Sequence, residues 1–208
     1  MALTNPVKSI LSASSLTILM LFFLVGCSSG GGSSSGGGSG TTATKILVIG
    51  DSIGTGYGIA EPYPNRLARA TGATVINDSA DGRVTTEGAA RVVSLLSAHK
   101  PSHLVVLLGT NDARVGSASG AVSNLQFMVN SAAAAGVVAV VGTLPPYLTT
   151  AALNQKSEQI SQGIRGLGGA RIAEIRSAMG DGSATIADGV HPNSAGQQII
   201  ADVFAASL

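Results

Sequence analysis

The sequence predicts an α/β protein in which helices pack on a parallel sheet. From Lys45 onward, short apolar runs alternate with longer segments of helical periodicity, which is typical of strand–helix units. The apolar runs are continuous in Val, Ile and Leu instead of alternating with polar residues, which indicates strands buried on both faces. Charged residues make up only 11% of the chain and tryptophan is absent, a composition that suits closely packed helices.

The expected elements follow one another in a regular order. Buried strands are predicted at residues 45–49, 74–76, 104–108 and 137–141, with a weak fifth strand at 170–172. Helices are predicted between and after them, at residues 64–70, 86–98, 121–135, 153–167 and 194–206. The sequence contains no internal repeat, so the pattern describes a single domain.

The length and charge of the chain limit its partners. At 208 residues there is room for one domain of about 100 to 150 residues and an appendage. The net charge is +1 and no run rich in Lys or Arg occurs, so we expect no nucleic-acid partner. Three scattered histidines and a single cysteine offer no cluster of metal ligands. We therefore expect no metal or cofactor. We also expect a monomer.

The first residues have the layout of a bacterial export signal. Lys8 precedes a mostly apolar run over residues 10–25, which ends in the tetrapeptide LVGC at residues 24–27. This tetrapeptide resembles the lipobox, in which the cysteine, here Cys27, receives a diacylglyceryl group and the chain is cleaved before it. The run is short for a transmembrane helix, which needs about 20 apolar residues. An uncleaved anchor and a plain secretory signal with an incidental cysteine are the alternatives.

A flexible segment follows the cysteine. Residues 28–40 consist only of Ser and Gly, a composition that holds a domain away from a membrane. Ser28, directly after Cys27, resembles the signal for export to the outer membrane, so we expect the protein in the bacterial cell envelope, anchored to that membrane and facing the periplasm. The predicted segments are a lipoprotein signal peptide (1–26), lipidated Cys27 with its tether (27–43) and a folded domain (44–208).

Polar residues collect directly after the predicted strands. The carboxyl ends of parallel strands meet at one edge of the sheet, which is where ligands bind in open α/β proteins. These residues are therefore candidates for a functional site. They are Gly50-Asp51-Ser52 after the first strand, residues 77–82 after the second, Gly109-Thr110-Asn111-Asp112 after the third, and Asp188-Gly189-Val190-His191-Pro192 before the last helix.

These segments hold every group that acyl transfer needs. Attack on an ester requires a hydroxyl nucleophile, a base, a group that orients the base, and hydrogen-bond donors for the oxyanion. Ser52 is the predicted nucleophile, and Asp188 precedes His191 by three residues, so one turn brings its carboxylate onto the imidazole. The backbone N–H groups of Ser52 and Gly82 and the side-chain amide of Asn111 are the predicted oxyanion donors.

The ordered segments resemble those of the SGNH, or GDSL, hydrolase family. The resemblance extends from about Lys45 to the C-terminus, and residues 50–58 and 77–82 are most similar to the bacterial thioesterase and lysophospholipase branch, also described as arylesterases. It implies a three-layer α/β/α sandwich with a flavodoxin-like sheet. The residues that match the family's functional positions are Ser52, Gly82, Asn111 and His191, with Asp188 as the third member of the triad.

The activity that this resemblance implies is hydrolysis of acyl esters or thioesters through an acyl-Ser52 intermediate. The substrate would be a small-molecule or lipid ester, and Cys27 would join the protein to the membrane. Removal of acetyl groups from carbohydrate or cell wall by the same fold is one alternative. A surface lipoprotein that binds without catalysis is another.

Several residues near these segments have more than one interpretation. Asp78 and Asp81 make the second segment unexpectedly acidic, and a carboxylate inside an oxyanion hole would oppose the developing charge. Asp51 and Asp112 are expected to support loop backbone. The run GTGYG over residues 54–58 is similar to a dinucleotide-binding loop, but its third glycine comes one position too early.

Substrate choice is expected to depend on three loops around the site. They cover residues 53–63, 113–120 and 145–150. A single sequence does not determine the shape of such loops, so the acyl group stays open.

Overall fold

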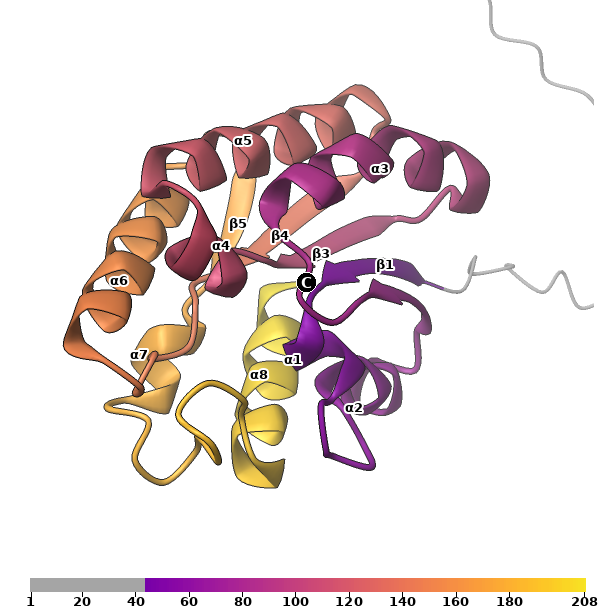
Figure 1. Ribbon diagram of the computed structural model, residues 1–208. Helices are drawn as coiled ribbons and strands as arrows, with labels where there is room; N and C mark the ends of the chain where they lie inside the picture. The colour runs from indigo at the N-terminus through magenta and orange to yellow at the C-terminus, as the bar shows by residue number, and fades with distance from the viewer. Residues whose placement is uncertain (1–43) are drawn as a thin grey trace, which may run out of the picture. The chain divides into compact units, whose positions relative to one another are not determined.

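A computed structural model describes residues 44–208; the predicted signal peptide, Cys27 and the tether lie outside these residues. A five-stranded sheet with the order β2-β1-β3-β4-β5 forms the centre (Figure 1). Every neighbouring pair of strands is parallel, and the strand order is that of flavodoxin-like folds. The strands are β1 (Lys45–Gly50), β2 (Thr74–Ser79), β3 (His103–Leu107), β4 (Val138–Gly142) and β5 (Ala170–Ala173).

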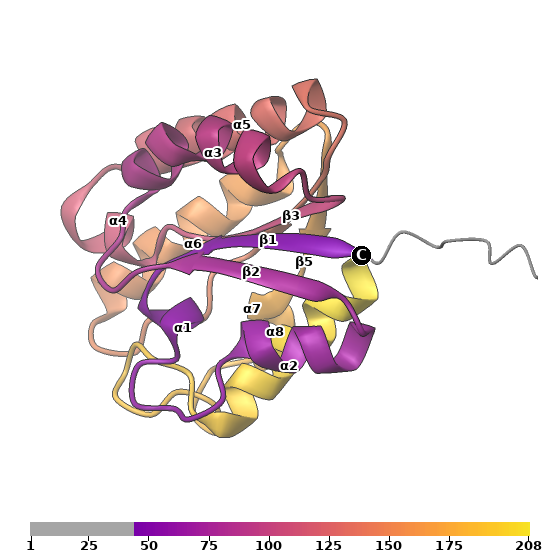
Figure 2. The same cartoon turned by 90° about the vertical axis from the view of Figure 1, so that its right-hand side faces the viewer.

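Helices cover both faces of the sheet, so the predicted three-layer sandwich is confirmed (Figure 2). One face carries α3 (Thr85–His99), α5 (Ala118–Ala134) and α6 (Ala151–Arg165), and the other carries α2 (Tyr63–Thr71) and α8 (Ser194–Ser207). Three short helices complete the described elements: α1 (Ser52–Thr55), α4 (Thr110–Val115) and α7 (Ile175–Met179).

The core lies between the helices and the three central strands. In β1, residues 46–49 are fully buried, as are Leu104, Val105 and Val106 of β3. Burial of each such aliphatic side chain contributes about 1.5 to 3 kcal/mol of hydrophobic stabilisation. Strands β1 and β3 therefore give the loops at their carboxyl ends a rigid base.

The second strand differs from the prediction. We expected a buried strand that ended at residue 76, whereas β2 continues to Ser79 and its pattern of burial is intermediate to exposed. The reason is topological, because β2 is an edge strand that pairs only with β1. Backbone pairing with β1 carries the polar residues Asn77, Asp78 and Ser79 into the sheet.

The predicted helices are all present, with ends shifted by up to three residues. Ser117 accepts a hydrogen bond from the Gly120 N–H, so α5 begins three residues earlier than its apolar periodicity suggests. Likewise Thr150 caps α6 by accepting from Leu153. The short helices α1, α4 and α7 were not predicted, because four to six residues are too few to show a helical period.

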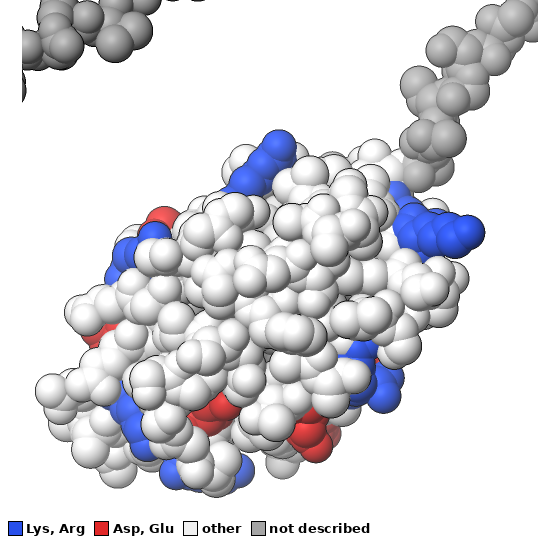
Figure 3. Space-filling view, turned by 90° about the horizontal axis from the view of Figure 1, so that it is seen from above, with Lys and Arg blue, Asp and Glu red and all other residues white. Residues whose placement is uncertain are grey.

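The outer surface of α3 and α5 carries few charged side chains, and these lie at its margin (Figure 3). A groove of about 720 Å³ between the two helices is lined by apolar side chains such as Leu96, Phe127 and Val137. It lies toward the amino ends of β3 and β4, away from the loops after the strands. No helix within residues 44–208 has the length and apolar character needed to span a bilayer.

Candidate active site

Three predicted site residues meet beyond the carboxyl edge of the sheet. The Ser52 Oγ lies 2.9 Å from the Nε2 of His191, and the Nδ1 of His191 lies 2.7 Å from the Oδ2 of Asp188. Both are hydrogen-bond distances. The imidazole therefore joins the hydroxyl to the carboxylate, with Nδ1–H donating to Asp188 and Nε2 free to accept the Ser52 proton.

Close packing after β1 fixes the position of Ser52. Asp51 caps the short helix α1, because its Oδ1 accepts a 2.9 Å hydrogen bond from the Ile53 N–H. A Cβ atom at Gly50 would lie 2.6 Å from the Ser79 Oγ, and one at Gly54 only 2.1 Å from it. Glycine at both positions lets β2 approach α1 closely, and Ser52 begins this helix at the sheet edge.

The loop that carries Asp188 and His191 is held by its own hydrogen bonds. The Oδ1 of Asp188 accepts from the backbone N–H groups of Val190 at 3.0 Å and His191 at 2.7 Å. Gly189, between Asp188 and Val190, adopts a φ of 88°, a conformation that would be strained in a residue with a side chain. The turn thus leaves Oδ2 free to accept from the imidazole.

The same hydrogen bonds determine the charge on Asp188. Partial burial raises its pKa, but the hydrogen bonds from the His191 backbone and side chain and from the Val190 backbone outweigh burial and lower the pKa to about 2. The carboxylate is therefore ionised at neutral pH, as a residue that orients an imidazolium must be.

The segments that carry the two other predicted oxyanion donors contact each other beyond the ends of β2 and β3. The Asn111 Nδ2 donates to the carbonyl oxygen of Arg83 at 3.1 Å, directly beside Gly82. Gly82 has a φ of 74° and open space where a side chain would stand. Asp112 holds the two segments together, because its carboxylate accepts from both the backbone and the hydroxyl of Thr85.

Two contacts tie the Gly82 segment to the nucleophile. The Ala80 N–H donates to the carbonyl of Gly50 at 3.2 Å, and the hydroxyl of Thr55 donates to the Oδ1 of Asp81 at 2.5 Å. The Gly82 segment therefore contacts both the Ser52 segment and the Asn111 segment, which favours a shared oxyanion site.

The acidic residues of the second segment have partners of their own. Asp78 pairs with Arg83 at 2.9 Å and with Arg91 at 2.5 Å, so its charge is compensated by two guanidinium groups. Asp81 is exposed and accepts from Thr55. The carboxylate of Asp78 is therefore directed at arginines and does not oppose an oxyanion.

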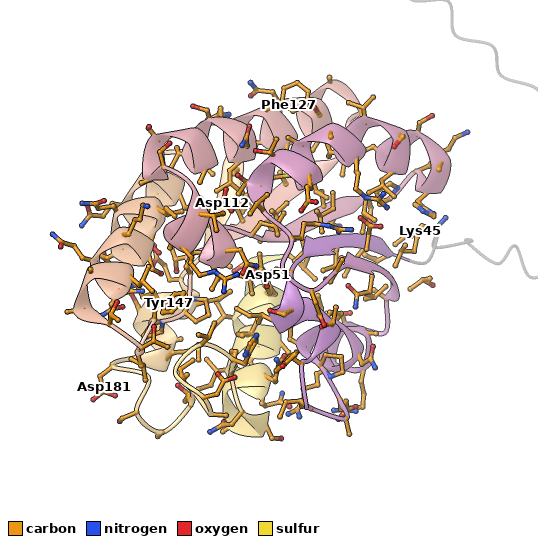
Figure 4. All side chains as sticks on the ribbon, in the orientation of Figure 1. Lys45, Asp51, Asp112, Phe127, Tyr147 and Asp181 are labelled. Carbon is orange, nitrogen blue, oxygen red and sulfur yellow. The ribbon has the colours of Figure 1, made fainter. Side chains whose placement is uncertain are left out.

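Polar atoms are buried without partners directly beneath the site. Among the described residues these are the Asp51 Oδ2, the Tyr63 hydroxyl and the Thr110 hydroxyl. Burial raises the pKa of Asp51 to about 7, against the lowering effect of the hydrogen bond from Ile53. Figure 4 shows Asp51 and Asp112 near the centre of the molecule, whereas Phe127 lies at its outer surface on α5.

Two features of the site could not be predicted from the sequence. The ring of Tyr57 stacks on the His191 imidazole, with centroids 4.3 Å apart and an interplanar angle of 23°. Arg176, on α7, donates to the carbonyl oxygens of Leu144 and Pro145 in the loop after β4. Both contacts join segments far apart in the chain, which a single sequence does not reveal.

His103 lies outside the site. His103 accepts or donates at 3.0 Å with the hydroxyl of Ser102, at the opposite edge of the sheet from Ser52. In the part of the chain that the structure describes, no three His, Asp or Glu side chains are grouped so that they could hold a metal ion.

Comparison with known proteins places these features in a family. Residues 48–199 match the GDSL-like lipase/acylhydrolase family. An arylesterase from Vibrio mimicus is 40% identical over 75 residues, which cover 33% of this chain and 38% of that protein. The alignment thus spans well under half the length of that relative.

Solved structures share the architecture over most of the domain. TesA superimposes with a TM-score of 0.67 and 25% identity, covering 79% of this chain and 98% of that one. The esterase EstA from Pseudoalteromonas sp. gives 0.62 with 22% identity, covering 79% and 96%. An acetylxylan esterase from Geobacillus stearothermophilus gives 0.68 with 19% identity, covering 79% and 93%. The last two show the shared fold.

The family match covers more than half of the chain, including both Ser52 and the segment with Asp188 and His191. The expected relationship is thereby confirmed: the chain belongs to the GDSL-like lipase/acylhydrolase family.

Proposed function

We propose that the protein is a serine esterase that acts through an acyl-Ser52 intermediate. The observation that carries the proposal is the hydrogen-bonded series from the Ser52 hydroxyl through His191 to Asp188. Family membership supports it, as do the similarities to an arylesterase and to TesA. A binding protein without turnover would have no need of this arrangement.

The reaction follows from the geometry. The Ser52 Oγ attacks the ester carbonyl carbon while its proton moves to the Nε2 of His191, and Asp188 stabilises the imidazolium. The resulting oxyanion accepts from the Ser52 and Gly82 N–H groups and the Asn111 amide. When the carbonyl carbon loses its bond to the leaving oxygen, that oxygen takes the proton from His191. Water then repeats the sequence and releases the acid from Ser52.

The exposed side chains around the site favour an apolar ester as substrate. Two of the large hydrophobic residues that remain exposed are Val115 and Leu148, with exposed fractions of 69% and 41%. They follow β3 and β4, in two of the three loops expected to determine substrate choice. Comparison of p-nitrophenyl acetate, p-nitrophenyl decanoate and an acetylated glycan tests this preference, and faster hydrolysis of the glycan would contradict it.

A fluorophosphonate probe tests the reaction type. The folded protein should gain one adduct, mapped to Ser52 by mass spectrometry, and Ser52→Ala should abolish both the adduct and ester hydrolysis. Ser102→Ala is the matched control, because Ser102 is an exposed serine at the opposite edge of the sheet. An adduct that persists in Ser52→Ala, or turnover equal to wild type, would rule out the proposal.

We also propose that Cys27 carries a lipid that holds the domain at the outer membrane, facing the periplasm. Support comes from the sequence, which has the LVGC tetrapeptide followed by the Ser/Gly segment. Growth with a labelled fatty acid should label the wild-type protein, and Cys27→Ala should lose the label and leave the membrane fraction. An unlabelled wild-type protein would contradict lipidation, and recovery in the inner-membrane fraction would contradict the sorting.

A further inference from the structure

We propose that Tyr57 is a positioning residue for His191, whose aromatic ring holds the imidazole in the plane that joins Ser52 to Asp188. The inference rests on the proposed function, since it concerns the base of that reaction. It starts from the stack of the two rings, whose centroids are 4.3 Å apart at an angle of 23°.

The two hydrogen bonds of His191 leave one motion of its ring free. The bonds to Ser52 and Asp188 lie in the plane of the imidazole, at Nε2 and Nδ1. They fix the position of the ring along the line between the two partners, but they oppose only weakly a tilt about that line. A contact with the face of the ring restrains the tilt, and the Tyr57 ring lies against that face.

The exposure of the carboxylate increases the need for this contact. The side chain of Asp188 is 48% exposed, whereas that of His191 is 19% exposed. Solvent screens an ion pair at this position and weakens the orienting effect of the carboxylate. The contact between the Tyr57 and His191 rings is not screened by solvent in this way. The electron-rich face of the Tyr57 ring also stabilises the imidazolium that forms when Ser52 loses its proton.

The backbone fixes Tyr57 relative to the nucleophile. The Tyr57 N–H donates to the carbonyl oxygen of Ser52 at 3.1 Å, directly after the cap residue Gly56. Gly56 has a φ of 79°, and a Cβ atom there would lie 2.6 Å from the Cβ of Pro62, so this turn requires glycine. Ser52, Tyr57 and His191 thus form a closed set of contacts, in which each residue is held by the other two.

Substitution of the ring tests the proposal. Tyr57→Leu keeps an apolar side chain but removes the aromatic face, and the rate constant for acylation of Ser52 should fall about tenfold, with little change in KM. Tyr57→Phe keeps the face and should stay within about twofold of wild type. Phe127→Ala is the matched control, because Phe127 is a half-exposed aromatic residue on α5, outside the site.

Proton NMR gives a readout that does not depend on turnover. The Nδ1 proton of His191, which is hydrogen-bonded to Asp188, should give a downfield resonance that is identified by its loss in His191→Asn. Tyr57→Leu should broaden or remove this resonance through faster exchange with water, and Tyr57→Phe should retain it. Circular dichroism and thermal unfolding verify that both variants are folded.

The outcomes separate the two proposals. If Tyr57→Leu acylates at the wild-type rate and keeps the downfield proton, Tyr57 does not position His191. If KM rises while the acylation rate is unchanged, Tyr57 contacts the substrate instead, and the inference is overturned. If the wild-type protein shows neither turnover nor a Ser52 adduct, the proposed function fails, while the NMR comparison still decides whether the stack orders the imidazole.

Discussion

Asp51 lies directly beside Ser52 and has a carboxyl group that is fully buried. Its Oδ1 caps α1 through Ile53, whereas its Oδ2 has no partner among the described residues. A charge at this position is poorly solvated, which is why burial raises the pKa to about 7. The residue next to the nucleophile therefore links folding to pH.

The stability of the protein is expected to fall between about pH 4 and pH 7. In this range the folded protein keeps the Asp51 proton that the unfolded chain, with a pKa near 3.8, has lost. The stabilisation that comes from the raised pKa of Asp51 is complete below about pH 4 and is lost as the pH rises through about 7. Over this range the free energy of unfolding falls by up to about 1.4 kcal/mol per pH unit. Urea unfolding at several pH values measures it.

The control for this slope is Asp51→Asn, which keeps the Oδ1 acceptor for Ile53. Its stability should change less steeply with pH over the same range. An identical pH dependence in both proteins would show that Asp51 does not carry the effect.

Asn111 is expected to matter for rate more than for folding. Asn111→Ala removes one oxyanion donor and should lower kcat by about 10² to 10³. It also leaves the Arg83 carbonyl without its 3.1 Å donor, which costs about 1 kcal/mol of stability. Steady-state kinetics and thermal unfolding measure both effects. Asn130→Ala, on the surface of α5, should change neither, and a fall in stability without a fall in kcat would make Asn111 structural.

For single residues, the sequence predicted partners that lie close together in the chain, but it did not predict contacts between residues far apart in the chain. Asp188 and His191 were predictable as partners because they are three residues apart and flank a glycine. Asp51 was expected to support loop backbone, and the structure shows it as the cap of α1, a helix too short to be predicted. By contrast, Tyr57 meets His191 only because α1 and the loop before α8 fold onto each other, and nothing in the local sequence records this.

Among the elements, the loop between β4 and α6 connects the sheet to the Asp188–His191 segment. The Leu148 N–H donates to the carbonyl oxygen of Gly189 at 2.7 Å. Arg176 holds the first part of the loop through the Leu144 and Pro145 carbonyls, and donates to the Oδ1 of Asn154 at 2.6 Å. This loop is therefore a support for the triad as well as a wall of the site.

Loss of this support should reduce both stability and activity. Arg176→Met removes hydrogen bonds from partly buried acceptors and should lower the free energy of unfolding by about 1 to 3 kcal/mol. The activity should fall as well, because the loop contacts the backbone between Asp188 and His191. Chemical unfolding and ester hydrolysis are the measurements.

Arg165→Met is the matched control, because both Arg165 and Arg176 pair with Glu158, but the side chain of Arg165 is 35% exposed, against 13% for Arg176. Its loss should cost at most about 1 kcal/mol and leave activity unchanged. Equal effects of the two substitutions would show that the loop contacts of Arg176 have no special role.

The long elements were predictable because their apolar periods are clear, whereas short elements and the edge strand were not. Helix α4 begins immediately after Gly109, and its six residues TNDARV show no apolar stripe. The edge position of β2 depends on which strands pair, and the hydrophobicity of the strands does not predict their order in the sheet. Resemblance to a known family implied a flavodoxin-like sheet, and the structure confirms it.

For the molecule as a whole, residues 41–208 are expected to fold and hydrolyse esters alone. The core, the triad and the supporting loops all lie within residues 44–208. A chain that begins at Thr41 should therefore have the kcat of the full chain and the same thermal unfolding temperature within a few degrees. A large loss of either would show that the preceding residues contribute to the domain.

The direction of β1 has a consequence for how the domain meets its substrate. The strand starts at Lys45 and leads to Ser52, so the point at which the preceding chain joins and the nucleophile lie at opposite edges of the sheet, about 20 Å apart at 3.3 Å per residue. If the proposed lipid anchor on Cys27 is present, the anchored part of the chain joins the domain at this point, and Ser52 would face away from the membrane. Esters dissolved in the surrounding fluid would then reach Ser52 directly, whereas esters in the anchoring bilayer would reach it only after the domain reorients.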